Sequence, residues 1–326
     1  MQGVKVGLFG SVKKHFIVQL IGIVLLEKSC KIYVKKVKNS KVIYRAKKTF
    51  DLESKENLSD EVVAYLLELQ EEHEQSYVTL FLNTLGQGAI SGCNTGAYEK
   101  FGVDKKSVKS ICLENNFTIY ASLIDINWVD KIFKKVGLDF VFSPFLVLNT
   151  LSKKDYSKDE VKLHILNTEN GLTMMIKKGK KLLYGVFFNI AKEEDLLHED
   201  FGSSSFETVD SLDEELFEDF DLDDDPLINE LGDAVEFDET ETASSQLSDM
   251  DNRVVRYLDA SLKEFYHSDL YDSEFISAVK IYDDAGIHED IIKHIENELL
   301  LDTSAENINV LDTVLEIAKE EVMGNA

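Results

Sequence analysis

Residues 120–151, YASLIDINWVDKIFKKVGLDFVFSPFLVLNTL, place apolar runs between residues that begin and end helices. The expected elements are a strand over 117–124, a helix over 128–136, a short strand over 140–142 and a helix over 145–151. Asn127 is expected to cap the first of these helices, and Gly137 to end it. Short strands that alternate with helices at this spacing are typical of an α/β fold.

The elements on either side of this stretch follow one order twice. In each copy, three strands precede a helix and a fourth strand. The expected strands are 20–26, 31–36, 41–49 and 77–82 in the first copy, and 161–166, 173–177, 182–189 and 275–282 in the second. The first copy's helix begins near Ser59 and Asp60, and further helices are expected over 253–266, 289–300 and 310–322. The duplication predicts two lobes, each a mixed sheet of four or five strands flanked by helices.

One stretch between these elements has no clear period. Residues 86–109 contain five glycines and are interpreted as loop-rich.

An acidic segment interrupts the second copy. Residues 193–250 carry twenty-three Asp and Glu and no Lys or Arg, so they supply −23 of the net charge of −26. Like charge at this density opposes burial, and we interpret the segment as a disordered acidic insertion. Leu212, Leu216 and Phe220 recur at i, i+4 and i+8 within it, on one face of a helix that would fold on a partner. A solvated insertion that adds only solubility is the alternative.

Residues 1–50 carry the opposite charge, with twelve Lys and Arg against Glu27 alone. A basic surface suits an anionic membrane, a nucleic acid or an acidic protein segment, although lysines also protect exposed sheet edges. The candidate partner-binding residues here are Lys35, Lys36, Lys47 and Lys48, in the expected second and third strands. The acidic segment would bind a basic partner, or would compete for residues 1–50.

The rest of the composition argues against several function classes. The longest apolar run, residues 16–26, is shorter than the roughly twenty residues that span a bilayer. Cys30, Cys93 and Cys112 match no metal or redox spacing, so we expect three buried thiols in a reducing compartment. No Walker loop, zinc spacing or nucleophile elbow occurs, and each of the seven histidines is expected at the surface or with its hydrogen bonds satisfied. We therefore expect no catalytic residue, metal site or cofactor.

Residues 120–151 resemble part of the actin-like proteins of pilus assembly and type II secretion, a family that includes PilM-like proteins and the cytoplasmic domain of the secretion L subunit. In that family one helix ends in Ala-Gly-Leu and a later one in Asn-Ala-Leu; Val136-Gly137-Leu138 and Asn149-Thr150-Leu151 stand at those positions. Residues 163–188 resemble the strands that open the family's second lobe, and 253–300 its closing elements. The resemblance implies an actin-like fold, a duplicated ribonuclease H-like unit with two lobes, outside 193–250.

Nucleotide-binding members of this family hold phosphate and metal with glycine-containing turns, because glycine lets the backbone approach the phosphates. Here the three corresponding turns have lost these residues and are interpreted as degenerate. Val24 and Leu26 replace an Asp and a Gly in the first, Leu166 and Thr168 fall in the second, and Asp283 and Asp284 replace glycines on the adenosine side. The two acids would repel a nucleotide's phosphates. Lys31 matches a family lysine after the first turn, but an exposed strand lysine is the preferred interpretation.

The resemblance implies a non-catalytic actin-like scaffold of a type IV pilus, type II secretion or DNA-uptake assembly. Its partners would be the cytoplasmic tail of a bitopic inner-membrane assembly protein and the assembly ATPase. An anionic membrane surface and a homodimer stay open, and no nucleic acid is expected. We expect the protein to be cytoplasmic and peripheral to the inner membrane.

Two other functions remain as alternatives: an ATP-binding actin-like filament or kinase-like enzyme with diverged phosphate loops, and a free-standing acidic interaction protein on the same fold. The expected domains are a basic N-terminal segment over 1–18, a first lobe over 19–158, a second lobe over 159–192 and 251–326, and the insertion over 193–250.

Overall fold

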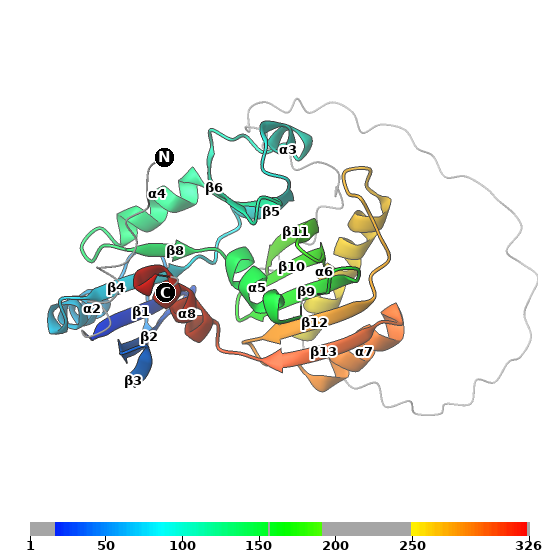
Figure 1. Cartoon of the computed structure of the whole chain (residues 1–326). Helices are drawn as coiled ribbons and strands as arrows, with labels where there is room; N and C mark the ends of the chain where they lie inside the picture. Colours follow the sequence, from blue (N-terminus) through cyan, green and yellow to red (C-terminus); the bar gives the residue numbers. More distant parts are fainter. Residues whose placement is uncertain (1–16, 156, 191–248, 325–326) are drawn as a thin grey trace, which may run out of the picture. The chain divides into compact units, whose positions relative to one another are not determined.

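The computed structural model describes residues 17–155, 157–190 and 249–324 (Figure 1). Nearly all of the acidic insertion lies outside these residues, and so do Leu212, Leu216 and Phe220 and the predictions made on them. The N-terminal basic segment lies outside them almost entirely as well.

The first sheet has the strand order β3-β2-β1-β4-β8. Its strands are β1 (Val18–Leu25), β2 (Ser29–Lys38), β3 (Lys41–Asp51), β4 (Ser76–Phe81) and β8 (Phe140–Phe142). β2 is antiparallel to both β1 and β3, whereas β4 is parallel to β1 and to β8. All eight residues of β1 are buried, as expected for an apolar strand at the centre of a sheet that is covered on both faces.

The second sheet repeats this arrangement in the order β11-β10-β9-β12-β13. Its strands are β9 (Val161–Thr168), β10 (Gly171–Lys178), β11 (Lys181–Asn189), β12 (Ala278–Asp283) and β13 (Asp302–Asn307). The strand directions match those of the first sheet, with two antiparallel pairs followed by two parallel pairs. Two ribonuclease H-like units of this topology in one chain make an actin-like fold, so the expected fold class is confirmed, with five strands in each sheet.

The helices begin and end largely where the sequence predicts. The longer ones are α2 (Asp60–Glu72), α4 (Leu123–Ile132), α5 (Pro144–Ser152), α6 (Asp249–His267), α7 (Glu289–Leu299) and α8 (Val310–Met323). Ser59 caps α2 by accepting from the Val62 amide. α4 begins earlier than expected, because its cap is Ser122 and not Asn127. The helix also ends earlier than expected, with Phe133 and not Gly137 as its C-cap; Gly137 lies in the turn that follows, with a φ of 79° that favours glycine.

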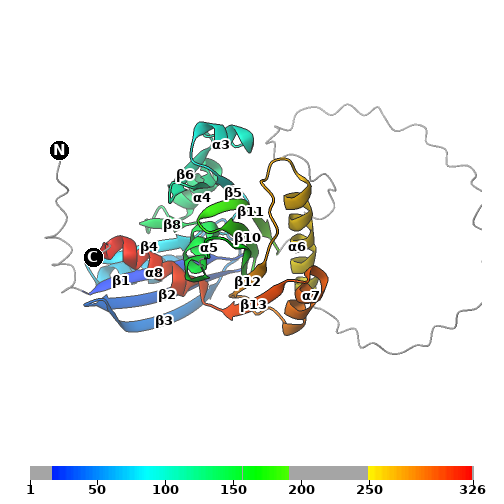
Figure 2. The ribbon, with the colours of Figure 1, turned by 45° about the vertical axis from the view of Figure 1, so that its right-hand side comes forward.

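Two helices pack against the sheet of the other copy. α8 follows β13 in the chain but contacts β1, β2 and β4, and α5 follows β8 but contacts β9 and β10. Both views draw α8 next to β1 (Figures 1 and 2). Apolar side chains of the two helices form one buried cluster with both sheets. The predicted lobe boundaries thus follow chain order, whereas packing places the last helix on the first sheet.

A small third sheet replaces the loop expected over 86–109, so that interpretation was wrong. It consists of β5 (Gln87–Ser91), β6 (Val108–Leu113) and β7 (Phe117–Ser122) in the order β5-β7-β6, with the short helix α3 (Thr95–Lys100) between β5 and β6. A Cβ on Gly88 would lie 2.4 Å from the Tyr120 hydroxyl of the neighbouring strand, so this glycine serves close packing inside a strand.

The small sheet also corrects the cysteine expectation. Cys93, after β5, and Cys112, in β6, form a disulfide with their Cα atoms 5.5 Å apart. Strand pairing through β7 brings these positions together although nineteen residues separate them in sequence. Cys30 is a buried thiol as expected, and burial raises its pKa to about 12.

The contact between β1 and α8 predicts a sharp response to substitution of Gly22. A Cβ at this buried position would lie 3.1 Å from Leu315 Cδ2 and 3.2 Å from Leu315 Cγ on α8. Gly22→Val is expected to lower the free energy of unfolding by about 1–3 kcal/mol through overpacking. The matched control is Gly96→Val, at an exposed position of α3. In urea denaturation it should change the free energy of unfolding by less than about 0.5 kcal/mol. Equal effects of the two variants would contradict this packing.

Candidate functional site

β3 presents the basic surface that the sequence predicts. It is an edge strand of the first sheet, and among the described residues only β2 pairs with it. Tyr44 is 49% exposed, and Arg45, Lys47 and Lys48 are exposed beside it. The register shifts opposite Lys36 and Val37, which leaves Ile43 as a bulge, and residues 44–51 then pair regularly with β2. The outer edge of this regular part is open to a further strand.

The ammonium groups of Lys47 and Lys48 lie over aromatic rings, and Lys47 also acts electrostatically on Asp284. The Lys47 ammonium lies 5.1 Å from the ring centroid of Tyr33, and that of Lys48 lies 4.3 Å from Phe50 and 4.4 Å from Tyr65. Cation–π contacts of this kind orient a side chain but leave its positive charge available to an anion. Among the residues that the structure describes, neither lysine takes part in an ion pair.

The other two candidate lysines lie elsewhere. Lys36 forms an ion pair with Glu72 of α2, and its ammonium lies 4.9 Å from the Tyr44 ring. Lys35 is completely buried, and its Nζ lies 2.8 Å from Asp312 Oδ1 and 2.8 Å from Glu316 Oε1 of α8. Lys35 therefore joins β2 to α8 and offers nothing to an external partner, which corrects its assignment as a partner-binding residue.

The first degenerate turn, between β1 and β2, is closed by its own side chains. Val24 and Leu26 are buried in the cluster shared with α8, and the Leu26 amide donates to the Ser29 carbonyl at 2.8 Å. Branched side chains thus fill the positions where an Asp and a Gly would leave the backbone open to a phosphate.

The second degenerate turn, between β9 and β10, is connected to the first. Leu166 is completely buried, and the Thr168 hydroxyl donates to the Gly171 carbonyl at 2.9 Å. Glu169, at the tip of this turn, forms an ion pair with Lys31 of β2. A direct link between protein side chains thus joins the two turns that hold phosphate in nucleotide-binding relatives.

The two aspartates after β12 accept hydrogen bonds from the protein's own backbone. Asp283 accepts from the Ile287 amide at 2.7 Å and from Asn167 Nδ2 at 2.8 Å. Asp284 accepts from the amide of Val310, the first residue of α8, at 2.8 Å, and burial raises its pKa. The acids therefore shape the turn and hold the start of α8; their repulsion of phosphates stays a prediction.

Little space remains between the turns. The cavity there has a volume of about 20 Å³, and its lining includes Glu27 from the first turn, Asn170 from the second, and Asn83, Thr84 and Trp128. Ligand pockets in proteins usually measure about 300–1,000 Å³. A nucleotide does not fit this cavity as it stands.

Sequence reasoning missed two buried polar residues of the second sheet, Lys177 and His164. Lys177 was not singled out, and His164 was expected to have its hydrogen bonds satisfied. His164 Nδ1 is buried without a partner among the described residues. The sequence carries a weak signal at most, a Lys and a His inside two apolar strands, because only the strand register brings them to one place.

The described residues contain neither a cluster of metal ligands nor a membrane-spanning helix. No group of His, Cys, Asp and Glu there could hold a metal ion. In the same part of the chain, no helix has the length and apolar content to span a membrane.

The chain thus has an actin-like fold. Its own side chains occupy or link the turns that correspond to the phosphate-binding turns of nucleotide-binding relatives. Two family models match it, each described as a domain of unknown function: DUF8569 over residues 16–149 and DUF8341 over residues 163–323. The two matches correspond to the two copies of the unit, and the second includes α8. Among curated proteins, none matches this sequence significantly.

Solved structures similar to the chain include members of the branch that the sequence resembles. The PilM–PilN type IV pilus biogenesis complex is 13% identical with a TM-score of 0.49, over 93% of this chain and 93% of that one. The cytoplasmic domain of EpsL, an inner-membrane component of the Vibrio cholerae type II secretion system, is 10% identical with a TM-score of 0.42, over 94% and 96%. A Bacteroides thetaiotaomicron protein with an actin-like ATPase fold and unknown function is 10% identical with a TM-score of 0.48, over 95% and 99%. The fold assignment itself rests on the repeated strand order.

Lys35 gives a test of the contact between β2 and α8. The double substitution Asp312→Asn and Glu316→Gln leaves its ammonium buried without a counter-charge, so the free energy of unfolding should fall by about 3–5 kcal/mol. Lys35→Met should cost much less, because it removes the buried charge and both carboxylates are partly exposed. Lys31→Met, which breaks an exposed pair, should cost about 1 kcal/mol or less in the same urea titration. A double variant no less stable than Lys31→Met would argue against the role of Lys35.

Proposed function

We propose that the protein is a non-catalytic actin-like scaffold that binds a membrane-anchored component of a pilus or secretion assembly at the cytoplasmic face of the inner membrane. The proposal that the protein is non-catalytic rests on the contacts within the three degenerate turns. Lys31 and Glu169 link two of them, buried Val24 and Leu26 fill the first, and Asp283 and Asp284 bind backbone amides in the third.

Physical reasoning supports the loss of nucleotide binding. A nucleotide between these turns would have to break the Lys31–Glu169 pair and open a cavity of about 20 Å³ to several hundred. It would also place phosphates near the carboxylates of Glu27, Glu169 and Asp284. The sequence resemblance to pilus and secretion scaffolds supplies the cellular setting of the proposal.

The partner surface in this proposal is the open edge of β3. An extended segment that pairs with residues 44–51 would gain main-chain hydrogen bonds from the edge and side-chain contacts from Tyr44. Arg45, Lys47 and Lys48 select an acidic segment by charge. The partner that we propose for this edge is the acidic, extended cytoplasmic tail of a bitopic membrane protein.

The positive charge of β3 also disfavours binding of a second copy of this protein at the same edge. Antiparallel pairing of two β3 edges would bring Arg45, Lys47 and Lys48 of each copy close to those of the other. Like charges on directly opposed strands are destabilising. A homodimer through this edge is therefore disfavoured.

One observation favours the ATP-binding alternative. Asn83 Oδ1 and Thr84 Oγ1 line the cavity between the turns and are buried without a hydrogen-bond partner among the described residues. Orphaned buried acceptors and donors can mark a site for a small polar ligand.

Calorimetric titration with Mg²⁺-ATP distinguishes the two functions. The full chain is expected to show no saturable heat up to millimolar ATP. Lys31→Ala, which removes the link between the turns, should leave this result unchanged, because the cavity and the first turn stay filled. Saturable binding of ATP at micromolar concentration would contradict a function as a scaffold that binds no nucleotide.

Reversal of charge on β3 tests the partner surface. The probe is a fluorescent peptide of alternating Glu and Val, about eight residues long, with a Lys–Val peptide of the same length as its counterpart. Lys47→Glu with Lys48→Glu should weaken binding of the acidic peptide about tenfold or more at low salt. The matched control, Lys105→Glu with Lys106→Glu on the exposed loop before β6, should bind like wild type.

Two results would contradict this surface: equal binding of the acidic and basic peptides, or equal affinity of both charge variants. Binding to vesicles of anionic lipid without binding to the peptide would assign the basic face to a membrane and would also overturn the proposed partner.

A further inference from the structure

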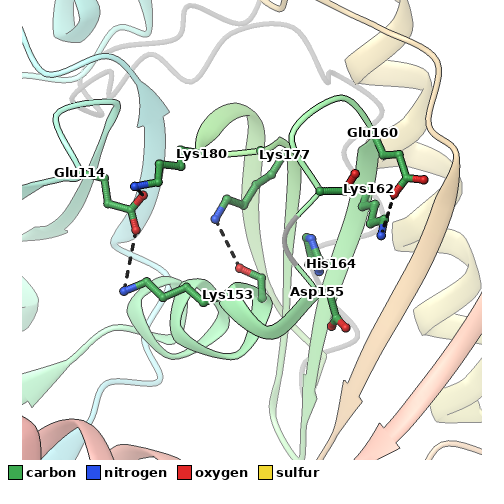
Figure 3. A pocket seen from close by; sticks show the side chains of 11 residues that line it. Glu114, Lys153, Asp155, Glu160, Lys162, His164, Lys177 and Lys180 are labelled. Carbon is green, nitrogen blue, oxygen red and sulfur yellow. Dashed lines mark hydrogen bonds and ion pairs between the residues drawn. The ribbon is translucent and has the colours of Figure 1, made fainter.

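A second pocket lies at the other end of the β9–β10 hairpin, away from the degenerate turns. The hairpin turn at Thr168 and Gly171 faces the first sheet. At the opposite end of the hairpin, Lys162 of β9 and Lys177 of β10 stand opposite each other in the strand register. The pocket there measures about 390 Å³ (Figure 3). Its lining comes from β9, β10, the turn to β11, the end of α5 with the 3-10 turn η1 (Lys153–Asp155), and the turn between β6 and β7. This volume falls within the usual range for small-molecule sites.

The charged residues at the rim neutralise one another. Glu114, from the β6–β7 turn, lies between Lys153 at 3.8 Å and Lys180 at 3.6 Å. Glu160 pairs with Lys162 at 2.9 Å, and Asp155 accepts a hydrogen bond from the Tyr282 hydroxyl. Every carboxylate among the described lining residues therefore already has a partner.

Lys177 differs from the rim lysines because it is buried and its partners are neutral. Its side chain is only 7% exposed, and Nζ donates to Asn149 Oδ1 at 2.7 Å and to Ser152 Oγ at 3.3 Å. An ammonium group has three donors, and the third has no hydrogen-bond acceptor among the described residues, although Nζ lies 5.7 Å from the ring centroid of Phe117. Among the described residues no carboxylate lies within ion-pair distance of Nζ.

This arrangement is unfavourable for the protein alone. A buried charge without a counter-charge destabilises the folded state, and burial lowers the pKa of Lys177 to about 8. A methionine would fill similar space without this penalty. Cores seldom retain such a group unless it acts on something else.

His164 supplies a second, independent observation. It lines the same pocket from β9, is 4% exposed, and stacks on Tyr282 with the ring planes 17° apart. Its Nδ1 has no hydrogen-bond partner in the part of the chain that the structure describes. Burial, aided by the positive charge of Lys177, lowers its pKa to about 4, so the ring is neutral at pH 7 and one nitrogen carries a proton to donate. Figure 3 shows His164 and Lys177 on neighbouring strands of the pocket wall.

We propose that this pocket binds a small phosphate monoester, with its phosphate on the Lys177 ammonium and within hydrogen-bond reach of His164. The chemistry of the lining favours phosphate over carboxylate. The described lining residues include lysines and no arginine: Lys177 is buried without a carboxylate partner, and Lys153, Lys162 and Lys180 at the rim each pair with a glutamate. Separate point charges suit a tetrahedral dianion, whereas a planar carboxylate is matched best by the fork of an arginine. The site is distinct from the filled nucleotide position and does not depend on the proposed scaffold function.

The pH dependence of binding follows from the groups that face Lys177. Glu114 raises the pKa of Lys177, Lys153 lowers it, and His164 is neutral above about pH 4. Asp155, Lys162 and Lys280 act on His164 from the same surroundings. Phosphate monoesters become dianions above about pH 6. Affinity should therefore be highest between about pH 6 and 8 and fall as Lys177 loses its proton above pH 8.

The experiment compares phenyl phosphate with benzoate on the full chain, by calorimetry and by NMR of the ligand. Phenyl phosphate is expected to bind saturably and benzoate much more weakly. Lys177→Met should reduce the affinity for phenyl phosphate about 100-fold or more, and His164→Phe, which keeps a ring beside Tyr282, about tenfold. Lys293→Met on α7, the matched control outside the pocket, should leave binding unchanged.

Thermal unfolding separates loss of the site from loss of the fold. Lys177→Met removes an unpaired buried charge, so its midpoint temperature should be at or above that of wild type while binding is lost. Absence of saturable phenyl phosphate binding at millimolar concentration, or equal binding by wild type and Lys177→Met, would overturn the proposal. Stronger binding of benzoate than of phenyl phosphate would overturn the phosphate assignment.

Discussion

The packing of α8 on the first sheet is the constraint on which the rest of the structure depends. The helix is the last element of the chain, yet it covers β1, the most buried strand of the first unit. Gly22 permits the close approach, and Lys35 fixes the helix through Asp312 and Glu316. Asp284 holds the Val310 amide, so the adenosine-side turn is also tied to the start of α8. One helix thus connects the core of the first sheet with the degenerate turn of the second.

This packing explains why residues of the three degenerate turns contribute to the stability of the fold. Val24 and Leu26 pack in the α8 cluster and Asp284 binds the first amide of α8, so these residues help to hold the two units together, whereas Asp283 shapes its own turn. The Asp283 and Asp284 carboxylates and the Thr168 hydroxyl are hydrogen-bonded within the protein, whereas Asn83 Oδ1 and Thr84 Oγ1 are left without a partner among the described residues. The pocket around Lys177 shows the opposite pattern, because there the rim charges are paired and the buried ammonium is not.

Much of the fold could be predicted because strongly apolar strands and capped helices carry local signals. β1, β9 and α2 stand close to their expected positions, since burial on both faces and the Ser59 cap are written in the sequence. β13, with the sequence DTSAEN, was missed because a polar edge strand has no apolar period. The small sheet was missed because Gly88 and its short strands resemble a loop until β7 pairs with both neighbours. Of the predicted surface, Lys47 and Lys48 are exposed, whereas Lys35 is buried by a helix 277 residues away in sequence.

The sequence by itself determined the duplicated α/β order, the degenerate turns and the basic character of β2 and β3, because each depends on residues close together in the chain. Only the tertiary structure decided the exchange of α5 and α8 between the sheets, the Cys93–Cys112 disulfide, and the joining of Lys177 and His164 in one pocket. These features arise where strand register and helix packing bring distant residues together, and neither is fixed by local propensity.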